Sequence, residues 1–162
     1  LIMMLLFTTA FAASPSFRTQ TLTALVEMFD DHSEIRFSGT TNGAETHKMS
    51  ILWMPDGYQI GLEEFDESRM IISAEGENGE SLNVAATAIS ESRSYSFDTE
   101  GATEEPATVR GNEAVVYQVK TEDEDKVTVL WTDIEKGWIV RVTGYNISKE
   151  DMLRISENDE IR

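Results

Sequence analysis

Two histidines are the residues best suited to acid–base catalysis or metal binding near neutral pH, and neither belongs to a recognisable motif. His32 lies in the segment Asp30-Asp31-His32-Ser33-Glu34, where oxygen and imidazole groups occur close together. Adjacent residues at a helix end point in different directions, so we interpret this segment as a solvated helix terminus rather than a metal site. His47 lies in a polar stretch, and no G-x-S-x-G motif accompanies it to indicate a serine hydrolase.

Two acidic clusters are the next candidates, as ligands for a cation. One contains Glu63, Glu64, Asp66 and Glu67, and the other spans residues 122–125. Neither matches the calcium loop D-x-[DN]-x-[DN]-G, in which the glycine turn makes the ligands converge. We therefore interpret both clusters as solvated turns that keep the domain soluble, with loose calcium association at millimolar levels as the alternative.

Aromatic and sulfur chemistry offer no clearer site. The chain of 162 residues has no cysteine, which excludes a cysteine nucleophile and a thiolate zinc site. Trp53, Trp131 and Trp138 are candidates for lining a ligand cleft, but the last two are in phase with valines on either side of one hairpin. We therefore predict that these two tryptophans pack in the core. The sequence predicts no catalytic, cofactor-binding or metal-ligating residue and no cofactor, and we expect a protein that works by contact and is not an enzyme.

The charge balance excludes two classes of partner. Lys and Arg number 13 against 30 Asp and Glu, which gives a net charge of −17. Neutralising phosphates requires a basic surface, so we expect no nucleic-acid binding. Docking on anionic lipid through protein charge is disfavoured for the same reason.

The first 13 residues, Leu1–Ala13, carry no charge and predict a membrane segment. The chain begins at Leu rather than Met, so we expect an N-terminally truncated sequence. As a helix, the run would be about 20 Å long, short of the roughly 30 Å hydrocarbon core. Two interpretations stay open, the end of a transmembrane helix or the apolar part of a signal peptide cleaved after Ala10-Phe11-Ala12. Both make residues 1–14 a membrane segment and 15–162 a single extracytoplasmic domain, and a buried soluble helix is the third alternative.

The remaining chain predicts an α+β fold with an N-terminal helix, an antiparallel meander of about six to eight strands and a short C-terminal helix. Leu22, Leu25, Val26 and Phe29 recur at helical spacing within residues 16–31. Turns are predicted at Pro55-Asp56-Gly57, Asn78-Gly79 and Glu135-Lys136-Gly137, and residues 90–106 are expected to be polar and irregular. Alternating runs at 115–119, 127–131 and 138–142 predict three paired strands. Ser148 and Asp151 predict the capped start of the final helix.

Short motifs along the chain resemble a bacterial family known as domain of unknown function 4367. Trp53–Tyr58 resembles the LPeGY turn of that family, and Val109–Ala114 resembles its nGheA motif. Val129–Trp131, Gly137-Trp138 and Ser148–Ile155 then follow the family's order of a strand ending in Trp, a strand beginning beside Gly, and a final skeellkiA helix. The likeness covers most of the chain.

The resemblance implies a single-pass protein of the bacterial cell membrane with this domain outside the cell. Ala10-Phe11-Ala12 and residues 18–31 are similar to the membrane exit of such proteins, and some members of the family are anti-sigma-factor-like. Ser156 stands where the family usually has Ala, and residues 61–105 offer no distinctive match. The family has no catalytic residues to transfer to this chain.

Three functions follow from the sequence. The first is a non-catalytic sensing or interaction domain of a membrane-anchored regulator, anchored by its N-terminal segment and contacting an unidentified protein or envelope ligand. The second is a module that binds an apolar ligand or a lipoprotein with a curved sheet around a helix, which requires an apolar cavity. The third is a hydrolase, which requires a cleft where His32 or His47 meets a carboxylate with a perturbed pKa.

Overall fold

Twelve strands and one helix make up most of the residues that the structure describes, so the protein is mostly β. The computed structural model describes residues 23–28, 32–38, 48–90, 94–121 and 124–161, and at 23–28, 32–38, 94 and 98 it describes the backbone alone. The elements in chain order are β1 (Thr23–Met28), β2 (His32–Ser38), β3 (Met49–Ile51), β4 (Gln59–Phe65), β5 (Arg69–Glu75), β6 (Ser81–Ala88), β7 (Ser94–Asp98), β8 (Thr103–Val109), β9 (Asn112–Lys120), β10 (Asp125–Asp133), β11 (Trp138–Tyr145), α2 (Lys149–Glu157) and β12 (Asp159–Ile161).

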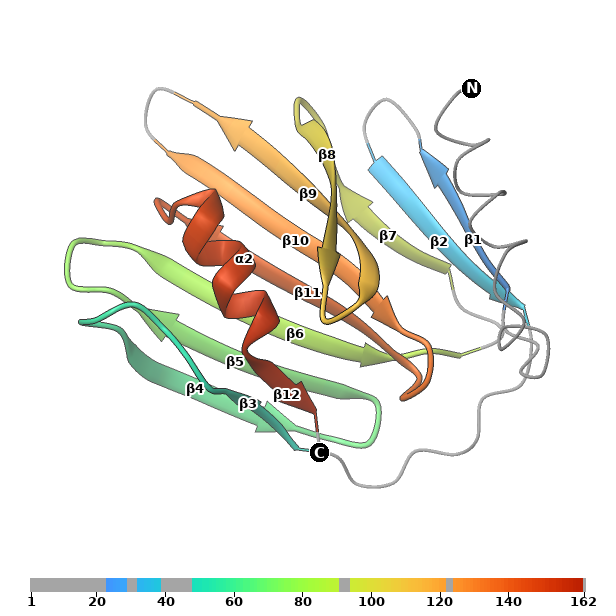
Figure 1. Ribbon diagram of the computed structural model, residues 1–162, viewed down its shortest axis with the longest axis horizontal. Coiled ribbons are helices and arrows are strands. Elements are labelled where there is room, and N and C mark those ends of the chain that lie inside the picture. The colour runs from blue at the N-terminus through green and yellow to red at the C-terminus, as the bar shows by residue number, and fades with distance from the viewer. Residues whose placement is uncertain (1–22, 29–31, 39–47, 91–93, 122–123, 162) are drawn as a thin grey trace.

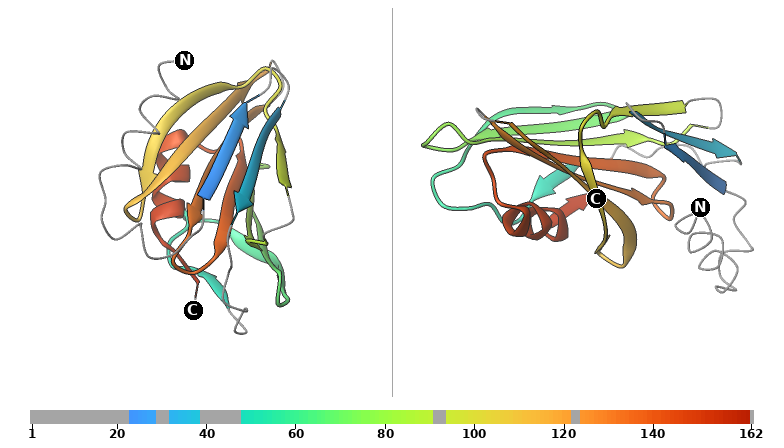
Figure 2. Two further views of the ribbon diagram at one scale, coloured as in Figure 1. Left: turned by 90° about the vertical axis from the view of Figure 1, so that its right-hand side faces the viewer. Right: turned by 90° about the horizontal axis from the view of Figure 1, so that it is seen from above.

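The largest unit is a seven-stranded antiparallel sheet with the order β4-β5-β6-β11-β10-β9-β8 (Figure 1). Three strands form a second sheet in the order β1-β2-β7, and β12 pairs with β3. The helix α2 and the β3–β12 pair cover one face of the large sheet, as the view from above shows (Figure 2). All pairings between these strands are antiparallel, which permits a sheet with one face packed and the other more polar.

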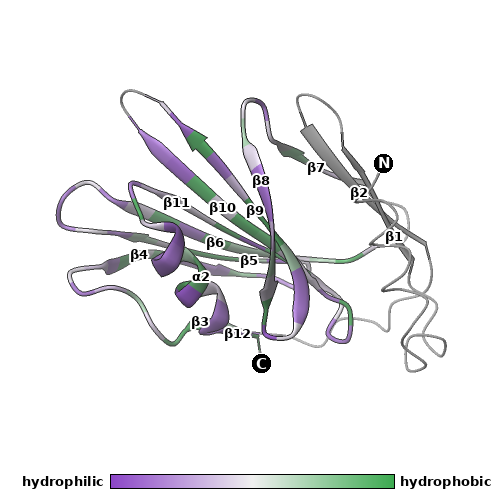
Figure 3. Cartoon of the chain, turned by 45° about the horizontal axis from the view of Figure 1, so that its top comes forward, coloured by the Kyte–Doolittle hydropathy of each residue, from purple (hydrophilic) through white to green (hydrophobic). Residues whose placement is uncertain are grey.

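The core lies between the large sheet and α2. One row of directly paired residues crosses five strands, from Val116 through Val129, Val142 and Val84 to Ile72, and each side chain is at most 1% exposed. Side chains alternate between the two faces of a strand, so this register places each strand's apolar set on the same face. The hydropathy colouring shows the resulting alternation of green and purple along β10 (Figure 3).

Trp131 and Trp138 belong to this core and are almost completely buried. They share one cluster with Val129, Val140 and Ile155, against which Leu153 packs in partial burial. The prediction that the C-terminal meander and the final helix share a buried layer is therefore confirmed.

The start of α2 has the predicted cap. The Ser148 Oγ accepts a hydrogen bond from the Asp151 backbone N–H at 3.1 Å, and donates to Asp151 Oδ2 at 2.9 Å. Gly144 on β11 allows the helix to approach the sheet closely, because a Cβ there would overlap Met152 Sδ. The helix is nine residues long. In the part of the chain that the structure describes, no helix is long and apolar enough to cross a membrane.

The three predicted turns are confirmed, and the turns at Asn78-Gly79 and Glu135-Lys136-Gly137 join strands that pair with each other. The strands on either side of the turn at Pro55-Asp56-Gly57, β3 and β4, pair with other strands. β5 and β6 pair in register around the turn that contains Asn78-Gly79, and Gly79 has the left-handed φ of 87° that such a hairpin requires. The meander of β9, β10 and β11 is antiparallel throughout.

The predicted N-terminal helix, and with it the α+β class, is wrong. Residues 23–28 form β1, which pairs with β2 along its whole length. The apolar residues of 22–29 fit a helical period, but Ala24, Val26 and Met28 also alternate as in a strand, and short apolar runs of this kind are ambiguous. Pairing with β2 decides the outcome, because tertiary context overrides a weak helical preference. Residues 16–22 and 29–31 lie outside the described residues, as does the proposed membrane segment 1–14.

The prediction that residues 90–106 are irregular is also wrong. Ser94–Asp98 form β7 and Thr103–Val109 form β8. The large antiparallel sheet has seven strands, within the predicted six to eight, and the strands of the two smaller sheets were not part of the predicted meander. Pro106 is tolerated because β8 is an edge strand of the large sheet, where a missing N–H disrupts only one ladder.

Candidate ligand-binding cleft

The face of the large sheet opposite α2 is partly covered by β7, and a cleft lies between them. Tyr95 and Phe97 of β7 pack against a second apolar cluster that contains Tyr117, Leu130 and Ile139. Beside this cluster the side chains leave a cavity of about 240 Å³, which we call the Arg141 cleft. The residues that line it are Asn83, Phe97, Thr99, Tyr117, Lys126, Thr128, Leu130, Arg141, Thr143 and Tyr145.

The floor of the Arg141 cleft is a row of polar side chains on four adjacent strands. Asn83 pairs with Thr143, Thr143 with Thr128, and Thr128 with Tyr117. The Oγ1 atoms of Thr128 and Thr143 lie 3.3 Å apart, and the Asn83 amide donates to Ser73 Oγ at 2.9 Å. The same register that buries valines on the helix face therefore aligns hydroxyl and amide groups on this face.

Arg141 is the central cation of the cleft. Its guanidinium carbon lies 5.8 Å from the centroid of the Phe97 ring, within the range of a cation–π contact. Its Nε is buried and forms no hydrogen bond with any described residue. Burial lowers the pKa of Arg141 below its ordinary value, and the positive charge of Arg69 lowers it further. Tyr145 acts in the opposite direction and raises the pKa of Arg141.

Arg69 joins Arg141 in a smaller adjoining cavity of about 110 Å³. It pairs with Thr87 of β6, while Arg141 pairs with Ala85, so the two arginines flank β6 two positions apart on one face. Phe97 and Arg141 line both cavities, so the two cavities lie next to each other beside the Arg141 side chain.

Some of the described cations have an acidic partner within ion-pair distance and others do not, and the two arginines of the cleft belong to the second group, together with Lys136 and Arg154. Hydrogen bonds from Ser68 lower the pKa of the nearby Asp66, and the charge of Arg69 also acts on this carboxyl and lowers its pKa further. Arg110, Lys120 and Lys149 each pair with a carboxylate, at 3.3, 3.6 and 2.8 Å respectively. Within the described residues, Arg69 and Arg141 form no ion pair, and no Asp or Glu is among the residues that line either cavity. Among the described residues, both cavities are therefore lined by cations and by no acid, in a chain with a net charge of −17.

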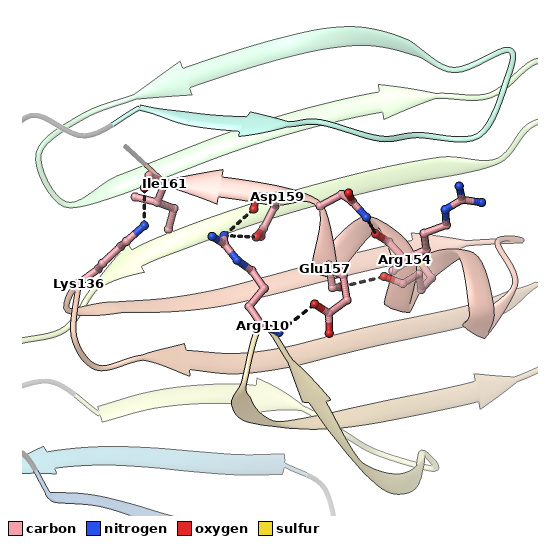
Figure 4. Close-up of polar contacts among 9 residues, drawn as sticks. Arg110, Lys136, Arg154, Glu157, Asp159 and Ile161 are labelled. Carbon is pink, nitrogen blue, oxygen red and sulfur yellow. Dashed lines mark hydrogen bonds and ion pairs between the residues drawn. The ribbon is translucent and has the colours of Figure 1, made fainter. Parts of the chain in front are cut away.

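A second polar cluster fastens the C-terminal strand to the β8–β9 hairpin (Figure 4). Arg110 and Gly111 form the two-residue turn with φ of 51° and 81°, as in a type I′ hairpin. The Arg110 backbone N–H donates to Glu157 Oε2 at 3.0 Å, and its Nη1 donates to Asp159 O at 2.5 Å and to Asp159 Oδ1 at 3.3 Å. These contacts join segments almost 50 positions apart, so we interpret the cluster as structural.

Asp159 is the most perturbed acid among the described residues. Its side chain is 2% exposed, and burial raises its pKa to about 7, although the positive charge of Arg110 opposes the change. Its Oδ2 has no hydrogen-bond partner among the described residues. Asp159 lines neither the Arg141 cleft nor the adjoining cavity.

The candidate residues taken from the sequence do not converge on a site. His32 begins β2 and does not end a helix, which corrects the prediction for that segment. His47 and residues 122–123 lie outside the described residues. Asp66 accepts hydrogen bonds from the backbone N–H groups of Ser68 and Arg69, both at 2.7 Å, which lower its pKa and identify it as a turn residue. Among the described residues, no group of three or more His, Asp or Glu could hold a metal ion.

The third tryptophan, Trp53, is partly buried against the main core. The Arg154 guanidinium carbon of α2 lies 4.0 Å from the centroid of its ring. Trp53 thus packs between the core and an arginine, and it lines neither cavity.

Sequence reasoning missed Arg69, Lys126 and Arg141. The one available signal was Arg141, a cation in the middle of the alternating run Trp138–Val142. That position predicts only that the face opposite the valines is not fully apolar. The convergence of Arg69 and Arg141 depends on the order of β5, β6 and β11 in the sheet, which one sequence does not encode in any local pattern.

The protein therefore belongs to the class of mostly-β proteins in which a large antiparallel sheet has a helix on one face, and here the other face carries a polar cleft. A family model described as domain of unknown function (DUF4367) matches residues 48–158, and this chain belongs to that family. The match includes residues 61–105, for which the short motifs gave no support. Comparisons with curated proteins and with solved structures gave no match.

Proposed function

We propose that this chain is the extracytoplasmic sensing domain of a single-pass bacterial membrane protein, and that it recognises its ligand in the Arg141 cleft without catalysing a reaction. The observation that carries the proposal is a cleft lined by cations, hydroxyl groups and aromatic rings, on the sheet face opposite the helix. Such groups bind and orient a ligand. The apolar run Leu1–Ala13 supports the membrane anchor, and an anti-sigma-factor-like output is the regulatory form that we propose.

The alternative is a module for an apolar ligand or a lipoprotein. It places the ligand between the curved sheet and the helix, where the core side chains are packed, Met152 and Ile155 being fully buried. The two cavities described above lie on the other face and contain arginines. The observations therefore favour a polar ligand.

The test compares two Thr→Trp substitutions in the full-length protein in its native host. Thr128→Trp fills the floor of the cleft, whereas Thr108→Trp places the same side chain on the exposed edge strand β8. We expect Thr128→Trp to change the transcript profile of the strain and Thr108→Trp to leave it unchanged. An unchanged profile with Thr128→Trp, in a strain where the protein is folded and present at normal levels, would overturn the sensing role.

Location is tested by fusing alkaline phosphatase, which folds to its active form only outside the cytoplasm, to the C-terminus of the full-length protein. Active phosphatase in the membrane fraction is the expected result. Inactive phosphatase on a stable fusion would contradict the extracytoplasmic placement.

A further inference from the structure

We infer that the Arg141 cleft is a site for a small oxyanion, a phosphate or carboxylate group, with Arg141 as its principal ligand and Arg69 and Lys126 as flanking cations. This inference deepens the proposed function, because it names the ligand class of the same cleft. It rests on unpaired cations, on cavity size and on the hydrogen-bonding groups of the floor.

The first step is the state of the Arg141 guanidinium. A guanidinium offers five N–H donors in a planar fork that matches carboxylate and phosphate oxygens. The Nε of Arg141 is buried and has no hydrogen-bond partner among the described residues, whereas the side chain as a whole is half-buried beside the Phe97 ring. Buried donors in folded proteins are nearly always paired, and a buried charge without a partner is costly. An anion in the cleft supplies the missing negative charge.

The second step is the sign of the surrounding charge. Arg69 lies close enough to Arg141 for its charge to act on it, and Lys126 lines the same cleft. Two cations that approach each other without an intervening acid repel, and the arrangement is stabilised when an anion lies between them. Lys126 is paired across the sheet with Tyr145, whose ring lines the cleft beside it.

The third step is size. The cleft volume of about 240 Å³ is below the roughly 300–1,000 Å³ of pockets that enclose drug-sized ligands. It therefore suits a small ion or a compact organic acid. The hydroxyl groups of Thr128, Thr143 and Tyr145 can donate to anion oxygens that Arg141 does not reach.

The experiment titrates the full chain, held in maltoside micelles, with sodium phosphate and separately with sodium acetate, and follows the amide and guanidinium signals by NMR. Sodium chloride at the same ionic strength is the control for screening. We expect saturable shifts at Arg141, Thr128 and Thr143 with at least one of the two oxyanions. Stronger binding of phosphate assigns a phosphoryl ligand, and stronger binding of acetate assigns a carboxylate.

Three Arg→Gln or Lys→Gln variants distinguish binding in the cleft from a general effect of charge. Arg141→Gln is expected to weaken binding at least tenfold, and Lys126→Gln about threefold. Arg154→Gln removes the same charge from α2, on the other face of the sheet, and is expected to change binding less than twofold. Shifts of equal size in Arg141→Gln and Arg154→Gln, or equal shifts with chloride, would overturn the inference.

The stability of the anion-free protein gives an independent readout. Removing a half-buried cation that forms no ion pair with any described residue is not expected to lower the thermal midpoint of Arg141→Gln. A fall of more than about 5 °C would show that Arg141 serves the fold, and would overturn its assignment as the anion ligand. The titration uses purified protein, so it can fail while the transcript experiment succeeds, and the two proposals are tested separately.

Discussion

The buried carboxyl of Asp159 predicts that the protein loses stability as pH rises from about 4 to 7. Burial raises the pKa of Asp159 from 3.8 to about 7 in the folded chain, whereas an Asp in the unfolded chain titrates near 4. Between these values the folded state holds a proton that the unfolded state has released. The free energy of unfolding therefore falls with rising pH, and the contribution is complete below about pH 4 and lost above pH 7.

The magnitude follows from the difference between the two pKa values. A difference of 7 − 3.8, or about 3 units, corresponds to about 4 kcal/mol over the whole range, at 1.36 kcal/mol per unit. Between pH 5 and pH 8, the part of this contribution that is lost is about 2–3 kcal/mol. This is a large fraction of the stability of an ordinary domain, so the effect is measurable.

Asp159→Asn removes the titration and keeps an oxygen to accept from Arg110 Nη1. The amide leaves one buried group unpaired at every pH, which lowers the stability of the variant by a constant amount. The comparison between wild type and variant therefore uses the slope of the unfolding free energy against pH, and not the free energy at a single pH. Urea unfolding followed by tryptophan fluorescence should show that the wild-type chain loses about 2–3 kcal/mol relative to Asp159→Asn between pH 5 and pH 8. The exposed carboxylate of Asp56 provides the control, and Asp56→Asn should keep the wild-type slope.

Two outcomes would refute the reasoning. Equal slopes of unfolding free energy against pH in wild type and Asp159→Asn would mean that folding does not shift the pKa of the Asp159 carboxyl. A wild-type chain that gains stability relative to Asp159→Asn as pH rises would mean that the charge of Arg110 outweighs burial, and that the pair is ionised in the folded state.

Two further predictions concern packing and use the same unfolding assay. Trp131→Ala should destabilise the protein by about 3–5 kcal/mol, because it removes a large core aromatic that is 4% exposed. Thr132→Ala on the opposite face of β10 should cost less than about 1 kcal/mol, and a Trp131 variant of unchanged stability would contradict the packing. Gly144→Ala should cost about 1–3 kcal/mol, because the added Cβ overlaps the buried Met152. A neutral Gly144→Ala would show that α2 can move away from β11 at little cost.

Local chemistry allowed several elements to be predicted from the sequence. Gly79 and its neighbour Asn78 specify a tight turn whatever surrounds them, because a positive φ is a property of one or two residues. Ser148 and Asp151 specify a helix start for the same reason, since both groups of the cap lie within one turn. Valines in alternation along β10 and β11 indicate the face that joins the main core, although Leu130 and Ile139 on the opposite face are also buried, in the second cluster.

Tertiary structure alone decided the N-terminal strands and β7. Residues 23–28 satisfy both a helical and an extended period, and only the hydrogen bonds to β2 distinguish them. Tyr95 and Phe97 of β7 alternate with polar residues, but the run is only five residues long, and it forms a strand by pairing with β2, about 60 positions earlier. Such pairings depend on residues far apart in the chain, so no short window of sequence contains the information.

The sequence by itself determined the acidic character, the absence of cysteine and the buried alternation of the C-terminal strands. Only the tertiary structure decided the candidate site, because Arg69 and Arg141 are 72 positions apart and meet through the order β5-β6-β11. A single arginine in a strand is chemically unremarkable. Two arginines on one face, under the aromatic rings of β7 and with no acid among the residues lining the cavities, form a local electrostatic field that depends on position in space and not on position in the sequence.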